Sequence, residues 1–181
     1  MTATDTQPPD RNQATNAVSP PRPDFDEMCA AIAAAGQDAM NPDAGNRQAL
    51  FERAILDVLD LRAHAMEIYV RHARNPDVRR KAYQTRKRAE RRIGRLLISA
   101  ERAGLRYMGR PEKGAAVGAP TELITLEKLG ITRKQSQTWQ KLARMSDAAF
   151  DAWLDAELTR KSQHRHRRAN TDAPPGRAGA Q

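Results

Sequence analysis

Two long amphipathic segments separated by a short break most constrain the fold of this chain of 181 residues. Between residues 46 and 74, apolar side chains recur at three- and four-residue steps, which indicates one long helix. Asn75 is a good N-cap and Pro76 suits the first position of a second helix, which is predicted to run to Ala103. Two long helices with a short joint form an antiparallel hairpin, so the predicted fold class is all-α.

The rest of the chain divides around this long antiparallel helical hairpin. Residues 36–46 are predicted to be a loop after a short helix at Phe25–Ala35. The Pro- and Thr-rich N-terminus has little to bury and is predicted to be disordered. The predicted divisions are a disordered tail 1–24, a helical region 25–104, a Gly- and Pro-rich flexible linker 105–121, a small helix-turn-helix unit 122–158 and a disordered basic tail 159–181.

The charge is strongly positive and unevenly spread. The chain has 31 Lys and Arg against 22 Asp and Glu, a net charge of +9. Residues 1–76 hold 7 basic and 11 acidic side chains, whereas residues 77–181 hold 24 and 11. A basic balance favours an acidic partner, either nucleic acid or an anionic membrane surface. The partner-facing surface is therefore expected in the second part of the chain.

The sequence offers no signal for an enzyme, a cofactor or a metal site. It has no Gly-rich phosphate loop or nucleophile elbow, and its His-x-His pair has no Cys or acidic partner nearby. The single cysteine, Cys29, cannot form an intramolecular disulfide. No apolar run is long enough to span a membrane, and no secretory signal is visible. We therefore expect a cytoplasmic non-enzyme without a small-molecule substrate, located at the nucleoid if it binds DNA.

Residues 123–145 have the pattern of a helix-turn-helix DNA reader. A short first helix is predicted up to Leu129, capped by Thr121 or Thr125. Gly130 lies where the turn commonly needs a positive φ, which glycine adopts without steric cost. Thr132 is the predicted N-cap of a second helix over residues 132–145.

This second helix separates into an inward and an outward face. Trp139 and Leu142, with Ser136 beside them, are predicted to point inward. Arg recognises guanine edges and Gln recognises adenine edges, while Lys mostly contacts phosphate. The predicted DNA contacts of the outward face are Arg133, Lys134, Gln137, Gln140, Lys141 and Arg144. Because Ser136 stands where Val or Ile is common, an ordinary αα-corner with a solvated polar face is the alternative.

The second long helix is unusually basic. Residues 79–95 contain nine basic side chains and one acid, Glu90. A face of one sign repels itself, a cost that a polyanion would relieve. The predicted phosphate contacts are Arg80, Lys87, Arg88, Arg91 and Arg95, with Arg92 beside them and Arg110 in the linker's Gly-Arg-Pro. The alternative is that acids of the preceding helix neutralise this face, namely Glu52, Asp57, Asp60 and Glu67. Gly94, inside this helix, is predicted to allow close helix packing.

The chain contains the runs RAERRIGRLL at residues 88–97 and LGITRKQSQTWQKLA at residues 129–143, joined by the Gly-Arg-Pro linker. These two runs resemble a family of small helical modules from bacterial phages, prophages and plasmids. The resemblance covers roughly residues 46–158 and implies a DNA transaction of a mobile element. Similar modules precede adenine-methyltransferase domains, but this chain lacks their Asp-Pro-Pro-aromatic motif, so that activity is not carried over. Thr138 replaces a basic residue that is common in the family.

Two functions follow from these patterns. The first is a DNA-binding protein of a bacterial mobile element that regulates transcription or assists replication or partition. Its second motif helix would read the major groove of double-stranded DNA, and the long hairpin would support a homodimer. The second is a non-enzymatic adaptor that binds a protein partner through the hairpin.

Overall fold

The computed structural model describes residues 24–41, 43–106 and 123–171, and within these residues the only regular elements are α-helices. The predicted all-α class is confirmed. The helices are α1 (Phe25–Ala34), α2 (Gln37–Met40), α3 (Arg47–Arg71), α4 (Pro76–Arg102), α5 (Arg133–Ala143) and α6 (Asp147–Thr171). The predicted disorder of residues 1–23 and 172–181 and the predicted linker over 107–121 lie outside the described residues.

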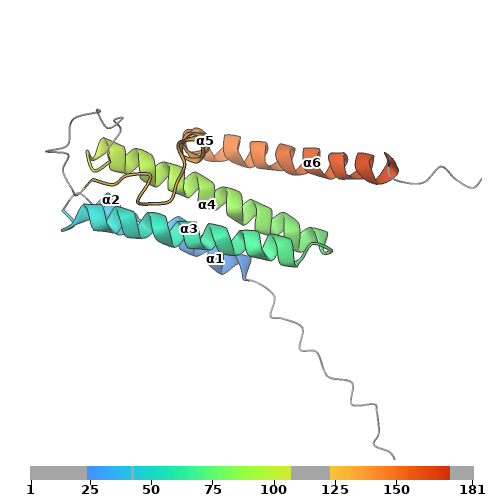
Figure 1. Ribbon diagram of the computed structural model, residues 1–181, viewed down its shortest axis with the longest axis horizontal. Coiled ribbons are helices and arrows are strands. Elements are labelled where there is room, and N and C mark those ends of the chain that lie inside the picture. Colours follow the sequence, from blue (N-terminus) through green and yellow to red (C-terminus); the bar gives the residue numbers. More distant parts are fainter. Residues whose placement is uncertain (1–23, 42, 107–122, 172–181) are drawn as a thin grey trace, which may run out of the picture.

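The main core lies between α3 and α4, which run side by side along the molecule (Figure 1). Phe51, Ile55 and Val58 of α3 are fully buried. Leu96 and Leu97 of α4 are fully buried as well. The side chain of Asn75 accepts hydrogen bonds from the backbone amides of residues 77 and 78, so α4 begins where the sequence predicts.

The segment between α1 and α3 was predicted to be a loop, and this is wrong in part. The short helix α2 occupies Gln37–Met40. Its Ala39 is fully buried and Ile32 of α1 is 3% exposed, and both belong to the main core. The burial of Ala39 in the main core therefore stabilises α2, although its sequence has too few apolar positions to predict a helix.

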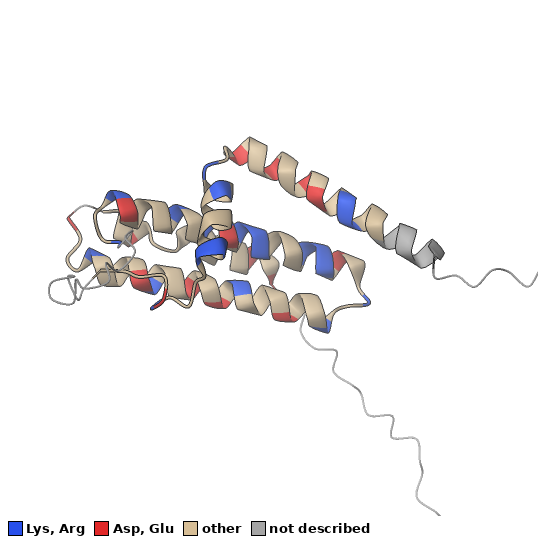
Figure 2. Cartoon of the chain, turned by 45° about the horizontal axis from the view of Figure 1, so that its top comes forward, with Lys and Arg blue, Asp and Glu red and all other residues tan. Residues whose placement is uncertain are grey.

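Helix α5 crosses α4 at close range (Figure 2), and Gly94 makes this crossing possible. A Cβ atom at Gly94 would lie 2.1 Å from the backbone carbonyl oxygen of Trp139 and 3.0 Å from the Cβ of Ala143. Any side chain at this position would therefore force the two helices apart. The predicted role of Gly94 in close helix packing is confirmed.

The predicted first helix of the helix-turn-helix is wrong, because residues 125–129 make one turn only. Upstream, the amide of Ile124 donates to the carbonyl of Leu105 at 2.9 Å, which ties the chain in an extended bridge. Downstream, Gly130 has a φ of +63° and ends the turn. The amide of Ile131 bonds to the carbonyl of Leu126 at 2.9 Å, the pattern of a Schellman motif. Between these two constraints there is no room for a second turn.

Helix α6 is longer than the sequence predicted. A basic disordered tail was expected from residue 159, but the helix continues to Thr171. Phe150 and Leu154 are buried against Tyr83 of α4 and anchor its first half. Residues 159–171 contain no Gly or Pro and several good helix formers, so nothing in the backbone stops the helix there. No described helix is both long and apolar enough to cross a bilayer.

Candidate nucleic-acid interface

Helix α5 begins with a complete capping box. The side chain of Thr132 accepts from the amide of Gln135 at 3.2 Å, and the amide of Thr132 donates to Oε1 of Gln135 at 2.8 Å. Two amides that would otherwise lack partners are therefore satisfied. Thr132 is the N-cap that the sequence predicted, and α5 itself spans Arg133–Ala143 within the predicted range 132–145.

The face of α5 that was predicted to point inward is buried, and it packs on α4. Trp139 is 3% exposed and Leu142 is 6% exposed. The guanidinium of Arg62, from α3, lies 5.2 Å from the centre of the Trp139 ring and adds a cation–π contact. Together with the Gly94 crossing, these contacts hold α5 in one orientation relative to the long helices.

The environment of Ser136 explains why a small polar residue stands where Val or Ile is common. It is 1% exposed, and its hydroxyl oxygen lies 3.2 Å from Nη2 of Arg106 and 3.0 Å from Nε2 of Gln140, both of which donate to it. Because the hydroxyl offers two lone pairs, it can accept both bonds. Gln140, predicted to contact DNA, is therefore partly occupied by a bond within its own helix.

Arg106 is a structural residue that the sequence patterns missed. Its side chain is 5% exposed, with Nη1 3.6 Å from a carboxylate oxygen of Glu101. Burial lowers the pKa of Arg106, and the nearby charge of Glu101 acts in the opposite direction. Its bond to Ser136 ties the chain leaving α4 to α5. No local signal distinguishes Arg106, because it stands at the edge of a stretch with linker composition.

The outward face of α5 carries a run of exposed positive and amide side chains. We define the α5 outer face as Arg133, Lys134, Gln137, Lys141 and Arg144, all of which are exposed. Figure 2 shows that α5 carries basic residues, and its sequence contains no acid. The side chains of these five residues form no ion pair or hydrogen bond with another described residue.

Several cations of the predicted one-sign face on α4 form contacts inside the molecule. Glu90 is 2% exposed and accepts from Nζ of Lys87 at 2.7 Å, from Nε of Arg86 at 2.8 Å and from Nε of Arg62 at 3.3 Å. Burial acts to raise the pKa of Glu90, but the hydrogen bonds and charges of Lys87 and Arg86 outweigh it and hold the pKa below its ordinary value. Lys87 is therefore a partner of a buried acid.

Arg91 is also committed to internal contacts. It is 8% exposed, and its guanidinium donates to the carbonyl of Leu142 at 3.3 Å and to that of Met145 at 2.6 Å. It also lies 2.8 Å from a carboxylate oxygen of Asp147, which Arg95 contacts at 2.6 Å. The hydrogen bond and charge of Arg95, and then those of Arg91, lower the pKa of Asp147. These two arginines join α4 to the α5–α6 junction.

The remaining basic residues of this set on α4 lie near other elements of the fold. Arg88 is exposed, with Nη1 4.0 Å from Sγ of Cys29. Arg80 is exposed and lies 3.9 Å from a carboxylate oxygen of Asp155. Nε of Arg92 donates to the carbonyl of Ala35 at 2.9 Å and holds the end of α1. Arg110 lies outside the described residues.

The acids of α3 that were predicted as the alternative, Asp57 and Glu67 among them, do not neutralise the basic residues of α4 either. Asp57 pairs with Arg53 at 3.0 Å, and Glu67 pairs with Arg71, so both bonds stay within α3. The cation that crosses between the helices is Arg62 of α3, which meets the acid Glu90 of α4. The acid of the interhelical pair is therefore on the basic helix, opposite to the expectation.

The site thus consists of one rigidly mounted helix with a basic outer face. Within the part of the chain that the structure describes, no group of three or more His, Cys, Asp or Glu side chains could hold a metal ion. A comparison of the chain with protein-family models, with curated proteins and with solved structures finds no match.

Proposed function

We propose that this protein binds double-stranded DNA through the α5 outer face. The observation that carries the proposal is the division of α5 into two faces. One is buried on α4 through Trp139 and Leu142, while the other exposes basic and amide side chains on a helix without an acid. Such a helix is attracted to a polyanion and presents side chains that recognise base edges.

The dimensions and mounting of α5 suit the major groove. With 11 residues it is roughly 16 Å long, and the groove is about 12 Å wide. The N-terminal part of such a helix usually contacts bases, which favours Arg133, Lys134 and Gln137 as base contacts. Lys141 and Arg144, nearer the C-terminus, are then placed for phosphate.

Rigid mounting supports the same proposal. The capping box fixes the start of α5, Gly94 lies against its middle, and Arg91 binds the carbonyls of Leu142 and Met145 at its end. A helix fixed at three places presents its outer side chains with little entropy left to lose on binding. The proposal rests on this mounting of α5 and not on a complete helix-turn-helix motif.

The experiment is a fluorescence anisotropy titration with duplex DNA, first random in sequence and then selected from fragmented genomic DNA. The test variant is Arg133→Ala with Gln137→Ala. The matched control is Arg102→Ala with Gln48→Ala, which removes the same side-chain types away from α5. The salt dependence of each is measured, because a protein that neutralises about six phosphates loses affinity with a slope of about −5 in log–log form.

The expected result is that the α5 variant loses discrimination between selected and random DNA and retains nonspecific binding, while the control behaves as the wild type. Absence of wild-type binding at low salt would overturn the proposal. If the α5 variant discriminated between selected and random DNA as well as the wild type does, Arg133 and Gln137 would not be the residues that recognise the bases. In the first case the adaptor function becomes the leading candidate.

The resemblance to phage, prophage and plasmid modules supplies a setting for this proposal. In that setting the protein would regulate transcription or assist replication or partition of a mobile element. A homodimer would present two α5 helices to two half-sites about one helical turn of DNA apart. Sites recovered by selection would then be palindromic, with the two half-sites at that spacing.

A further inference from the structure

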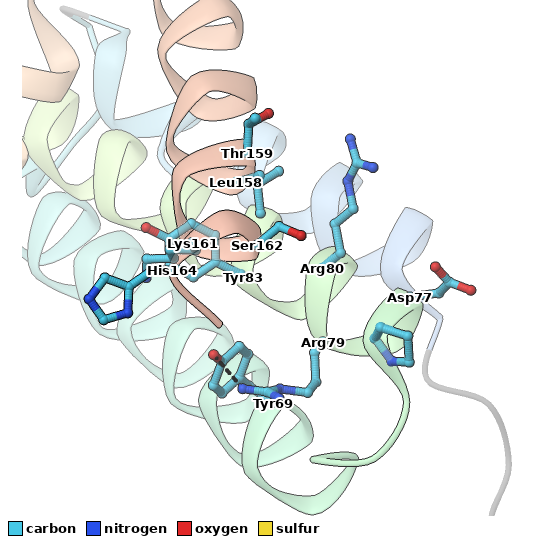
Figure 3. Close-up of a pocket in the computed structure, with 11 residues that line it drawn as sticks. Tyr69, Asp77, Arg79, Arg80, Tyr83, Leu158, Thr159, Lys161, Ser162 and His164 are labelled. Atoms are coloured by element: carbon cyan, nitrogen blue, oxygen red, sulfur yellow. Dashed lines mark hydrogen bonds between the residues drawn. The ribbon is translucent and has the colours of Figure 1, made fainter. Parts of the chain in front are cut away.

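A cavity of about 630 Å³ lies between the α3–α4 connection and the second half of α6 (Figure 3). It is lined by both aromatic and charged side chains, among them Tyr69, Arg79, Arg80, Tyr83, Lys161 and His164. Its volume falls within the range of small-molecule sites, about 300–1,000 Å³. The lining residues come from three helices, and the sequence patterns gave no sign of a small-molecule site.

The charge of this cavity is predominantly positive. Arg79 and Arg80 come from α4 and Lys161 from α6, whereas Asp77 is the one acid among the lining residues. Arg79 is held in place, since it donates to Oη of Tyr69 at 2.8 Å and to the carbonyl of Ala73 at 3.1 Å. Arg80 is exposed and its only ion pair within the described residues, to Asp155, spans 3.9 Å, so two guanidinium groups are placed here for an oxyanion.

Lys161 is the residue that most favours an anionic occupant. Its Nζ lies 3.9 Å from the centre of the Tyr83 ring, and it forms no ion pair with another described residue. The nearest acid, Glu157, already pairs with Arg160 at 2.6 Å and accepts a hydrogen bond from Tyr83 at 3.4 Å. Burial lowers the pKa of Lys161, with Glu157 opposing this shift. A half-buried ammonium that forms no ion pair is stabilised when an anion binds.

From these observations we infer that the cavity between α3, α4 and α6 binds a phosphate group through Arg79, Arg80 and Lys161. The cavity is larger than inorganic phosphate, and Tyr69 and Tyr83 are among its lining residues. The phosphate belongs either to a free mononucleotide or to the backbone of bound DNA. The inference does not depend on α5, because α5 precedes the start of α6, whereas the cavity is lined by residues from the second half of α6.

The test uses the full chain and two probes, AMP followed by calorimetry and a random duplex followed by anisotropy across a salt series. The variants are Lys161→Gln and Arg80→Gln, and the control is Arg102→Gln, an exposed arginine away from the cavity. Circular dichroism verifies that each variant is folded. Arg80 is 61% exposed, so Arg80→Gln is expected to leave the packing intact. This variant therefore tests the inference even if Lys161→Gln fails to fold.

A mononucleotide site predicts saturable AMP binding that both variants weaken at least tenfold and the control leaves unchanged. A backbone site predicts no AMP binding but a salt slope for the duplex that is smaller by about one in each variant. Either result supports the inference and identifies the source of the phosphate. The inference is overturned if AMP does not bind and the salt slopes of the variants equal that of Arg102→Gln. Loss of duplex binding in the α5 variant alone tests only the proposed function.

Discussion

Gly94 is the residue at which the addition of a single methyl group has the most direct effect on stability. In an exposed helix Gly94→Ala would stabilise the chain by about 1 kcal/mol. Here the added Cβ would lie 2.1 Å from the carbonyl oxygen of Trp139, so α4 and α5 must separate. We expect a net loss of about 1–3 kcal/mol in the free energy of unfolding, measured by urea denaturation followed through tryptophan fluorescence.

Gly45→Ala is the matched control, because a Cβ at Gly45 meets no atom within 4 Å. This variant is expected to unfold at the same urea concentration as the wild type or slightly higher. If Gly94→Ala were as stable as Gly45→Ala, the close crossing of α4 and α5 would be contradicted.

Glu90 is the second residue with a large expected effect. Glu90→Gln removes the one negative charge shared by Arg62, Arg86 and Lys87, which leaves three cations close together. We expect the free energy of unfolding at neutral pH to fall by about 3 kcal/mol. Glu127→Gln, at an exposed position, is the control and should change it little.

The same residue gives a pH dependence whose sign is fixed. The pKa of Glu90 is lowered in the folded state from its ordinary value of 4.5. Its ionised form therefore contributes full stability above about pH 4.5, and this contribution is lost as pH falls through the folded-state pKa. Urea midpoints measured between pH 3 and pH 7 should converge for wild type and Glu90→Gln at the acid end. A constant difference across this range would contradict the assignment.

At the scale of elements, the junction between α5 and α6 depends on α4. Arg91 binds two carbonyls at the end of α5, the carboxylate of Asp147 at the start of α6, and the ring of Phe150 at 4.5 Å. Arg91→Ala removes the side-chain donor from both carbonyls, although that of Leu142 still accepts from the amide of Met145, and should lower the free energy of unfolding by about 1–3 kcal/mol. Urea denaturation measures this loss.

Arg95→Ala is the matched comparison, since Arg95 contacts the same Asp147 but its side chain is 41% exposed. It should cost clearly less stability than Arg91→Ala, because exposed ion pairs contribute little. A larger effect of Arg95→Ala would indicate that the carboxylate, and not the carbonyls at the end of α5, holds the junction together.

Helix starts were predictable from sequence because their signals are local. Asn75 with Pro76 marks the start of α4, and Thr132 marks the start of α5. The inward face of α5 was equally predictable, because the apolar spacing of Trp139 and Leu142 follows the helical period. Each of these features is decided by residues within one or two turns of one another.

The roles of the basic residues were not predictable from sequence, because their partners are remote. Arg91 bonds to the carbonyl of Leu142, 51 positions away, and Glu90 gathers a cation from another helix, 28 positions away. A count of charges along α4 treats all of them as solvent-facing. The first motif helix failed for a similar reason, since the bridge between Leu105 and Ile124 is formed across the linker.

At the scale of the molecule, α3 and α4 form a platform on which α5 is fixed and from which α6 extends (Figure 1). Among the basic side chains of the second part of the chain, several on α4 are neutralised internally, whereas those of the α5 outer face are exposed. This arrangement exposes the outer face of one short helix, and DNA binding by that face is the function we propose for it.

Site-specific photocrosslinking distinguishes the α5 outer face from an exposed surface that belongs to neither proposed site. A benzophenone amino acid is placed at Gln137, on the α5 outer face, or at Leu56, which is 44% exposed on α3, and each protein is irradiated with labelled duplex DNA. DNA binding through α5 predicts a covalent adduct from position 137 and none from position 56. Equal adducts from both positions, or an adduct from position 56 alone, would contradict it.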